Sequence, residues 1–117
     1  MKHIQFDDTI IGEPSLSFSV DKDNFVNLWI GTFNSLMKYA KPNKDGYWDE
    51  LSLHYQMHDG FYEEPNWKVP STESYLNCIA DIVVPGSDMQ TMQTKENIIR
   101  LFEYALTEKL IVAIDYN

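Results

Sequence analysis

Residues 15–20 read Ser-Leu-Ser-Phe-Ser-Val, so polar and apolar side chains alternate without a break. Neighbouring side chains of a β-strand point to opposite faces, and the alternation therefore predicts a strand that buries Leu16, Phe18 and Val20 on one side. A strand with one apolar face needs a second layer of structure to cover that face. We expect the chain to build its core between a sheet and helices.

Two segments carry the periodicity of helices. Apolar side chains recur at every third or fourth position over residues 25–40, which predicts a long amphipathic helix. Asp21 or Asp23 would cap this helix, and Pro42 follows its end. A second amphipathic helix is expected from Thr94 onward, because threonine is a common cap and apolar positions follow it at helical spacing.

The remaining segments favour strands. Residues 51–57 alternate apolar and polar side chains, and residues 110–116 are rich in β-branched types, so we expect a strand in each. Residues 75–84 fit both a helix and a strand, and the β-branched run near their end favours a strand. The resulting order of elements predicts a single α+β domain over residues 1–117, with two amphipathic helices packed on a mainly antiparallel or mixed sheet.

Composition excludes several classes of function. The net charge is -9 and Arg100 is the single arginine, so we expect no direct binding to nucleic acid and no attraction to anionic membranes. No segment is long and apolar enough for a signal peptide or a membrane span, which predicts a cytoplasmic protein. Cys78 is the single cysteine and lies in an apolar segment, which indicates a packed core thiol rather than a nucleophile.

Residues 45–67 combine six carboxylates and six aromatic rings with no lysine or arginine. An acidic surface that carries rigid rings suits binding to a basic protein, because charge steers the encounter and buried rings supply affinity. The ten residues of this segment that we expect to contact a partner are Asp45, Trp48, Asp49, Glu50, Asp59, Phe61, Tyr62, Glu63, Glu64 and Trp67.

The best candidates for a metal or acid–base site are His54, His58 and Asp59. In a strand, the two histidines would be separated by about 13 Å, too far apart to bind one zinc ion. Carboxylate pairs such as Glu63 and Glu64 exist, but nothing in the sequence indicates the burial that a general acid needs. We therefore expect no catalytic residue, no metal and no cofactor, and the segment reads as a binding surface rather than an active site.

The segments Gly46–Glu50 and Asp59–Trp67, in a small acidic chain, resemble the immunity proteins of bacterial toxin–immunity systems, including those of contact-dependent growth inhibition. This resemblance implies a cytosolic inhibitor, not an enzyme, that binds one cognate toxin domain and blocks its active site or substrate groove. The toxin of such a pair is often a basic nuclease. Carboxylates would then stand where nucleic-acid phosphates sit, while Trp48, Tyr62 or Trp67 fills a pocket.

Two other classes of function stay open from the residues alone. The aromatic side chains could line the cleft of a small-molecule or peptide-binding accessory domain. His54, His58 and Asp59 could instead serve a metal-dependent hydrolase, which would require stoichiometric metal.

Overall fold

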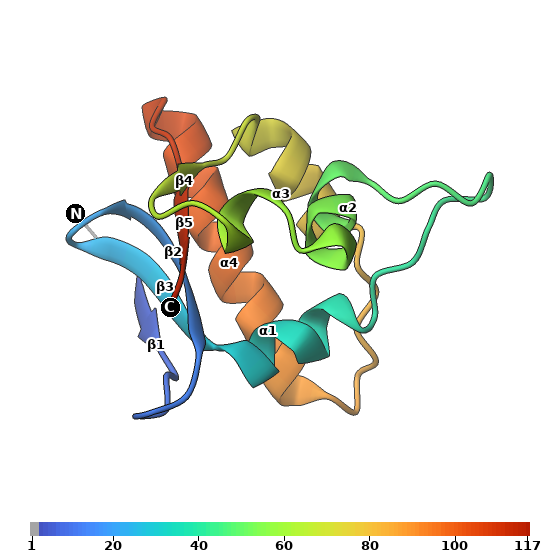
Figure 1. Cartoon of the computed structure of the whole chain (residues 1–117), viewed down its shortest axis with the longest axis horizontal. Coiled ribbons are helices and arrows are strands. Elements are labelled where there is room, and N and C mark those ends of the chain that lie inside the picture. Colours follow the sequence, from blue (N-terminus) through green and yellow to red (C-terminus); the bar gives the residue numbers. More distant parts are fainter. Residues whose placement is uncertain (1–2) are drawn as a thin grey trace.

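The computed structural model describes residues 3–117, and its strands form one mixed sheet in the order β1-β3-β2-β5-β4 (Figure 1). β1 runs parallel to β3, whereas every other neighbouring pair is antiparallel. β5 lies between β2 and β4, with Phe18 opposite Ile114. The strands are β1 (Gln5–Asp7), β2 (Ser15–Asp21), β3 (Asn24–Trp29), β4 (Trp67–Lys68) and β5 (Ala113–Tyr116).

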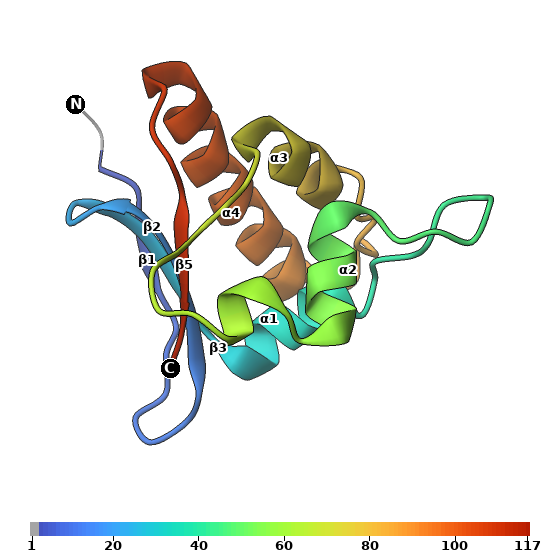
Figure 2. The same ribbon diagram turned by 45° about the horizontal axis from the view of Figure 1, so that its top comes forward.

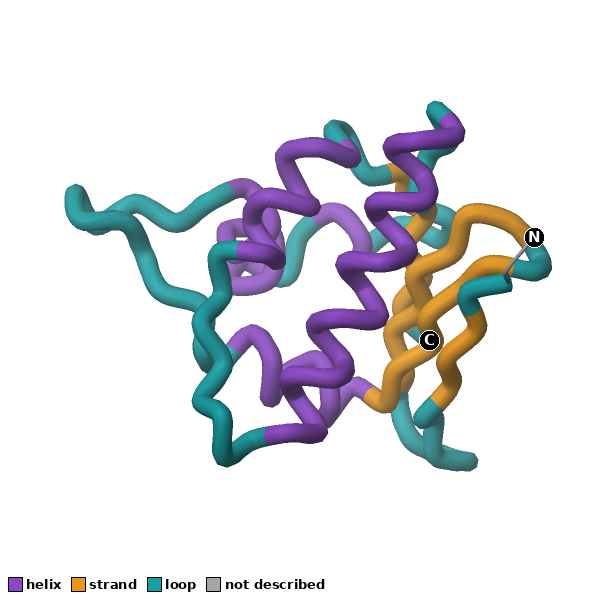
Figure 3. The backbone as a smooth tube through the Cα atoms, turned by 180° about the vertical axis from the view of Figure 1, so that it is seen from behind, coloured by secondary structure: helices purple, strands orange, loops and turns teal. Residues whose placement is uncertain are grey.

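Helices pack on one side of this sheet, as Figures 2 and 3 show from two directions. The described residues form four α-helices and one 3₁₀ turn, so the expected α+β domain is confirmed but the expected number of two helices is wrong. The helical elements are α1 (Ile30–Met37), α2 (Glu50–Met57), η1 (Gly60–Tyr62), α3 (Thr72–Ala80) and α4 (Met89–Glu108).

β2 is the strand that the alternation predicts. Leu16 and Phe18 are completely buried, and the serines at positions 15, 17 and 19 are half-buried. Val20 is only half-buried because it lies near the end of the strand, beyond the residues that pair with β5. The apolar face of β2 therefore forms the floor of the core.

The helix predicted over residues 25–40 is wrong in its first part, which is strand β3. Val26 and Leu28 are buried there with period two, opposite β2. Asp21 does not cap a helix: its Oδ1 accepts hydrogen bonds from the backbone N–H of Asp23, at 2.9 Å, and from the side chain of Asn24, at 3.0 Å. These bonds close a β-hairpin turn, and the helix begins only at α1.

The strand predicted over residues 51–57 is wrong, because this segment is helix α2. Asp49 caps the helix by accepting a hydrogen bond from the backbone N–H of Ser52 at 2.8 Å. Leu51 and Ser52 are buried, whereas the alternating partners Leu53 and Met57 are 43% and 67% exposed. Burial therefore follows one stripe of a helix rather than one face of a strand.

The preference for a strand over residues 75–84 is also wrong, since α3 occupies most of this segment. Ser71 caps α3 through its Oγ, which accepts from the N–H of Ser74 at 3.1 Å. The second predicted helix is confirmed as α4, although it begins at Met89 with Asp88 as its cap. The predicted closing strand is confirmed as β5.

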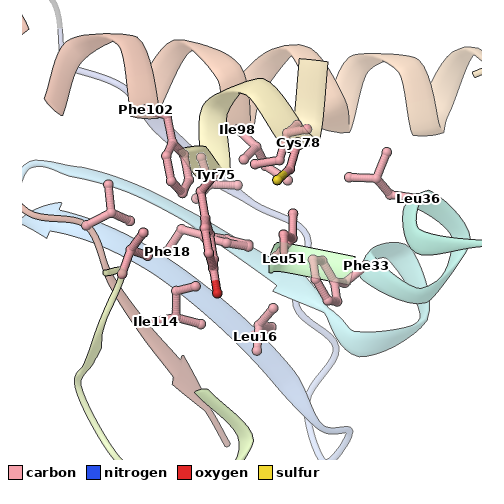
Figure 4. Close-up of a cluster of buried hydrophobic side chains, with 14 of the residues drawn as sticks. Leu16, Phe18, Phe33, Leu36, Leu51, Tyr75, Cys78, Ile98, Phe102 and Ile114 are labelled. Carbon is pink, nitrogen blue, oxygen red and sulfur yellow. The ribbon is translucent and has the colours of Figure 1, made fainter. Parts of the chain in front are cut away.

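The core lies between α4 and the sheet, and Figure 4 shows the side chains that fill it. Phe18 of β2 contacts Phe33 of α1 and Phe102 of α4, with ring centroids 5.8 and 6.0 Å apart. Tyr75 of α3 stacks on Phe102 with centroids 6.4 Å apart. Cys78 is 8% exposed beside them, and burial raises the pKa of its thiol, so the expectation of a packed core cysteine is confirmed.

Candidate protein-binding surface

Helix α2 divides the ten residues expected to bind a partner into two groups. Residues 45–50 precede or begin the helix, whereas residues 59–67 follow it. An eight-residue helix is about 12 Å long, and the two groups lie at its opposite ends (Figure 2). The structure therefore does not gather the ten residues around one centre, and each group has to be judged by itself.

In the first group, several side chains stabilise the fold. Trp48 is half-buried and packs against the hydrophobic core. Asp49 caps α2, and Oε2 of Glu50 accepts a hydrogen bond from the hydroxyl of Ser74 at 3.0 Å. Asp45 alone of the four expected residues is fully exposed. Trp48 packs on the core but stays partly exposed, so its expected contact with a partner stays a prediction.

In the second group, Phe61 belongs to the core, and Tyr62 and Trp67 pack on it from partly exposed positions. Phe61 is 1% exposed, and its ring centroid lies 6.2 Å from that of Phe33 and 5.9 Å from that of Trp67. Trp67 is half-buried and covers Gly60, where an added Cβ would lie 3.0 Å from the indole ring. Phe61 is therefore unavailable to a partner, and Trp67 holds the turn at Gly60 in place.

The rings that do reach the surface form a short stack. His58 ends α2 and lies parallel to Tyr62, with centroids 4.6 Å apart and an angle of 18° between the rings. Tyr62 in turn contacts Tyr116 of β5 edge-on at 5.1 Å. Tyr62 is half-buried, which raises the pKa of its phenol, whereas Tyr116 is 41% exposed. This stack joins three elements that are distant in the sequence.

Exposed carboxylates adjoin His58 and Tyr62 in the sequence. Asp59, Glu63 and Glu64 are all exposed, and the segment 59–64 holds no lysine or arginine. The pKa of the Glu63 carboxyl is raised, first because the protonated form donates a hydrogen bond to Asp59 and then by the negative charge of Asp59, by loss of solvent and by the negative charge of Glu64. We call the surface formed by the ring stack and these carboxylates the aromatic–acidic patch; its members are His58, Asp59, Tyr62, Glu63, Glu64 and Tyr116.

Repulsion between the neighbouring carboxylates of Asp59, Glu63 and Glu64 contributes to the raised pKa of Glu63. A cation from a partner would relieve that repulsion, whereas an anion would increase it. The carboxylates and Tyr62 are recognisable in the sequence, but Tyr116 is not, because no local pattern shows that the end of β5 meets η1. His58 was expected only as a candidate for a metal or acid–base site.

The histidines of α2 have partners that differ from those of a metal site. The ring of His54 meets Trp67 edge-on at 5.3 Å, and its Nδ1 is hydrogen-bonded to the hydroxyl of Tyr75. Because residues four apart on a helix are neighbours, the strand spacing used to argue against a shared zinc ion was wrong. In the part of the chain that the structure describes, no group of three His, Cys, Asp or Glu side chains could hold a metal ion.

Among the depressions that lie outside the patch, two have mainly polar linings. One, of about 710 Å³, lies between β1 and α4 and includes Gln5, Arg100 and Tyr104 in its lining. The other, of about 400 Å³, lies beside α3 and includes Asp49 and Glu73. Polar and charged side chains dominate both linings, so neither resembles the enclosed apolar pocket that is typical of small-molecule sites.

No family model, curated protein or solved structure was found to match this chain. Across residues 3–117, no helix combines the length and apolar character needed to cross a membrane. The geometry of the chain's own residues is therefore the basis for any functional conclusion.

Proposed function

We propose that this protein is an immunity-type inhibitor that binds and neutralises a basic toxin domain, such as a nuclease, in the cytosol. The observation that carries the proposal is the aromatic–acidic patch, in which the exposed carboxylates of Asp59, Glu63 and Glu64 adjoin, in the sequence, the stacked rings of His58 and Tyr62. The resemblance of the sequence to immunity proteins supports the same function.

In this proposal, charged groups and aromatic rings contribute to binding in different ways. A net charge of -9 attracts a basic partner over long distances, and the patch orients the two proteins as they meet. Rings that lose water at the centre of an interface then supply most of the affinity. Carboxylates placed against the groove of a nuclease would occupy the positions of nucleic-acid phosphates, which would block the substrate.

The proposal is tested by capture from a native lysate with the purified protein as bait, at low and at high salt. We expect one basic protein to be captured at both salt concentrations, and to be captured more slowly at high salt, because steering between exposed charges is screened. The retained protein, purified, should have nuclease or other toxic activity that the bait inhibits at a ratio of one to one.

A pair of double variants separates the patch from the overall charge. Glu63→Lys with Glu64→Lys reverses the charge inside the patch. Glu96→Lys with Glu103→Lys makes the same change in charge on exposed positions of α4. We expect the first variant to lose the partner and the second to keep it. Equal binding by both variants, or the absence of any basic protein from the capture, would overturn the proposal.

A further inference from the structure

His54 of α2, Trp67 of β4 and Tyr75 of α3 form a cluster of three rings. The centroid of His54 lies 5.3 Å from that of Trp67 and 6.0 Å from that of Tyr75, and the last two are 6.2 Å apart. Nδ1 of His54 is hydrogen-bonded to the hydroxyl of Tyr75. His54 and Trp67 are half-buried, whereas Tyr75 is completely buried and reaches into the core (Figure 4). This cluster therefore joins α2 to both α3 and β4.

The hydrogen bond between His54 and Tyr75 has one favourable direction while the imidazole is neutral. Burial, followed by the negative charge of Glu50, raises the pKa of the Tyr75 phenol, so the hydroxyl keeps its proton and needs an acceptor. A neutral imidazole has one donor nitrogen and one acceptor nitrogen. We therefore assign the proton of neutral His54 to Nε2, which leaves Nδ1 free to accept the bond from the buried hydroxyl.

The same cluster holds the turn that carries the aromatic–acidic patch. The indole of Trp67 covers Gly60, where an added Cβ would lie 3.0 Å from the ring. Gly60 begins η1, and its carbonyl accepts hydrogen bonds from the backbone N–H groups of Glu63, at 2.9 Å, and Glu64, at 3.2 Å. Tyr62 belongs to the same turn. A movement of Trp67 would therefore reach both the ring and the carboxylates of the patch.

We propose that His54 is a pH-sensitive latch, which holds the turn at Gly60 in place while its imidazole is neutral and releases it when the imidazole is protonated. Histidine changes its charge between about pH 5 and 8. A proton taken up at Nδ1 converts this nitrogen from an acceptor into a donor, so the buried hydroxyl of Tyr75 loses its acceptor. The latch itself depends only on the fold. Its consequence, release of the toxin as the pH falls, rests on the proposed function.

Charged and titratable groups surround His54 on every element that packs against it. Glu50 lies one turn before His54 on α2, and its Oε2 is held by the hydroxyl of Ser74 at 3.0 Å. Cys78 of α3 stays neutral, because burial raises the pKa of its thiol. The other groups are exposed or already hydrogen-bonded: Asp49 and His58 on α2, Asp59, Glu63 and Glu64 around η1, Lys68 on β4, Glu73 on α3 and Asp115 on β5. The variants compared below leave all of these groups in place.

Amide hydrogen exchange of the free protein, followed by NMR at about pH 8 and about pH 5, measures the latch directly. A buried hydroxyl without an acceptor shifts an equilibrium by about 5- to 150-fold, so the protection factors of the Glu63 and Glu64 amides should fall by that factor on acidification. His54→Asn keeps an acceptor oxygen and does not titrate, so it should abolish the fall. His3→Asn, the same exchange at an exposed histidine, is the matched control and should keep it.

Tyr75→Phe provides a second variant, because it keeps the ring and removes the hydroxyl. It should also abolish the fall in protection. No fall in the wild type, or the same fall in His54→Asn and Tyr75→Phe as in the wild type, would overturn the latch and leave the proposed function standing.

The consequence for binding is measured by surface plasmon resonance, with the basic protein that the wild-type bait captures as the immobilised probe. Between about pH 7.5 and 5.5 the dissociation rate of the wild type should rise at least about 5-fold, whereas that of His54→Asn should change by less than about 2-fold. Equal increases in both proteins would overturn the control of binding by His54. If protection depends on His54 but no basic protein is captured at either pH, the latch stands and the proposed function fails.

Discussion

Replacing Phe61 by alanine should severely destabilise the fold, although its sequence neighbours belong to the exposed patch. The ring is 1% exposed and contacts Phe33, Tyr62 and Trp67, with centroid distances of 6.2, 4.6 and 5.9 Å. Phe→Ala changes in cores cost about 3–5 kcal/mol through lost burial and the cavity left behind. An unfolding entropy of about 2.1 cal/mol/K per residue gives about 0.25 kcal/mol/K for this chain, so Tm should fall by about 12–20 °C.

Thermal and urea unfolding, followed by circular dichroism, measure this loss. The control is Tyr47→Ala, which removes a ring that is 71% exposed and should change the free energy of unfolding by less than about 0.5 kcal/mol. If Phe61→Ala cost less than about 1 kcal/mol, the ring would not be part of the core, and the assignment of η1 as a packed element would be refuted.

Three further outcomes are expected. Asp88 accepts a hydrogen bond from the Tyr39 hydroxyl at 2.8 Å, which holds the pKa of the Asp88 carboxyl below its ordinary value of 3.8. The contribution of the Asp88 carboxylate to stability is therefore present above pH 3.8 and is lost as the pH falls below it. Asp88→Asn should flatten the dependence of the urea midpoint on pH between about pH 6 and 2. Parallel curves of urea midpoint against pH for the variant and the wild type would contradict this. Gly60→Ala should cost about 1–3 kcal/mol in urea unfolding, because φ is 66° and the new Cβ would press on Trp67; wild-type stability would show that the turn relaxes freely. Cys78 should react with a disulfide reagent only after denaturation, since it is buried and its thiol pKa is raised, and rapid labelling of the native protein would argue against that burial.

The sequence predicts an element correctly where the spacing of its apolar residues and its length both fit the same type of secondary structure. β2 has an unbroken alternation, and α4 is long enough for its apolar positions to repeat over several turns. Residues 51–57 show the opposite case, because seven residues with alternating character also supply the few apolar positions that a short helix needs. Asp49 was the decisive signal, since an aspartate three positions before Ser52 is placed to cap a helix.

The error over residues 25–40 has a related cause. Val26 and Leu28 fit the period of a strand, and the residues from Phe33 to Met37 fit that of a helix. Taken as one run, the apolar positions of both segments also match the spacing of one long helix. The cluster of turn formers from Asp21 to Asn24 marks the hairpin, but the same residue types also cap helices, so the local sequence does not decide between the two.

The sequence predicts which residue types the candidate surface contains, but not which of their side chains are exposed. Its carboxylates are recognisable in the sequence, but the exposure of each ring depends on tertiary packing. Phe61 is buried because η1 is held beside β5, and Tyr116 joins the patch because β5 ends there. Tyr47 is exposed because the turn around Asn43 carries it away from the body. None of these placements follows from local periodicity.

The position of β5 inside the sheet has a consequence for biosynthesis. β2 and β3 can pair as soon as their hairpin leaves the ribosome, but the other edge of β2 waits for Ile114 to arrive opposite Phe18. Pairing between segments so distant in the sequence is slow. Until then β2 offers unpaired backbone groups beside exposed apolar side chains, a combination that favours aggregation. The nascent chain should therefore be most vulnerable to self-association until residues 113–116 have left the ribosome.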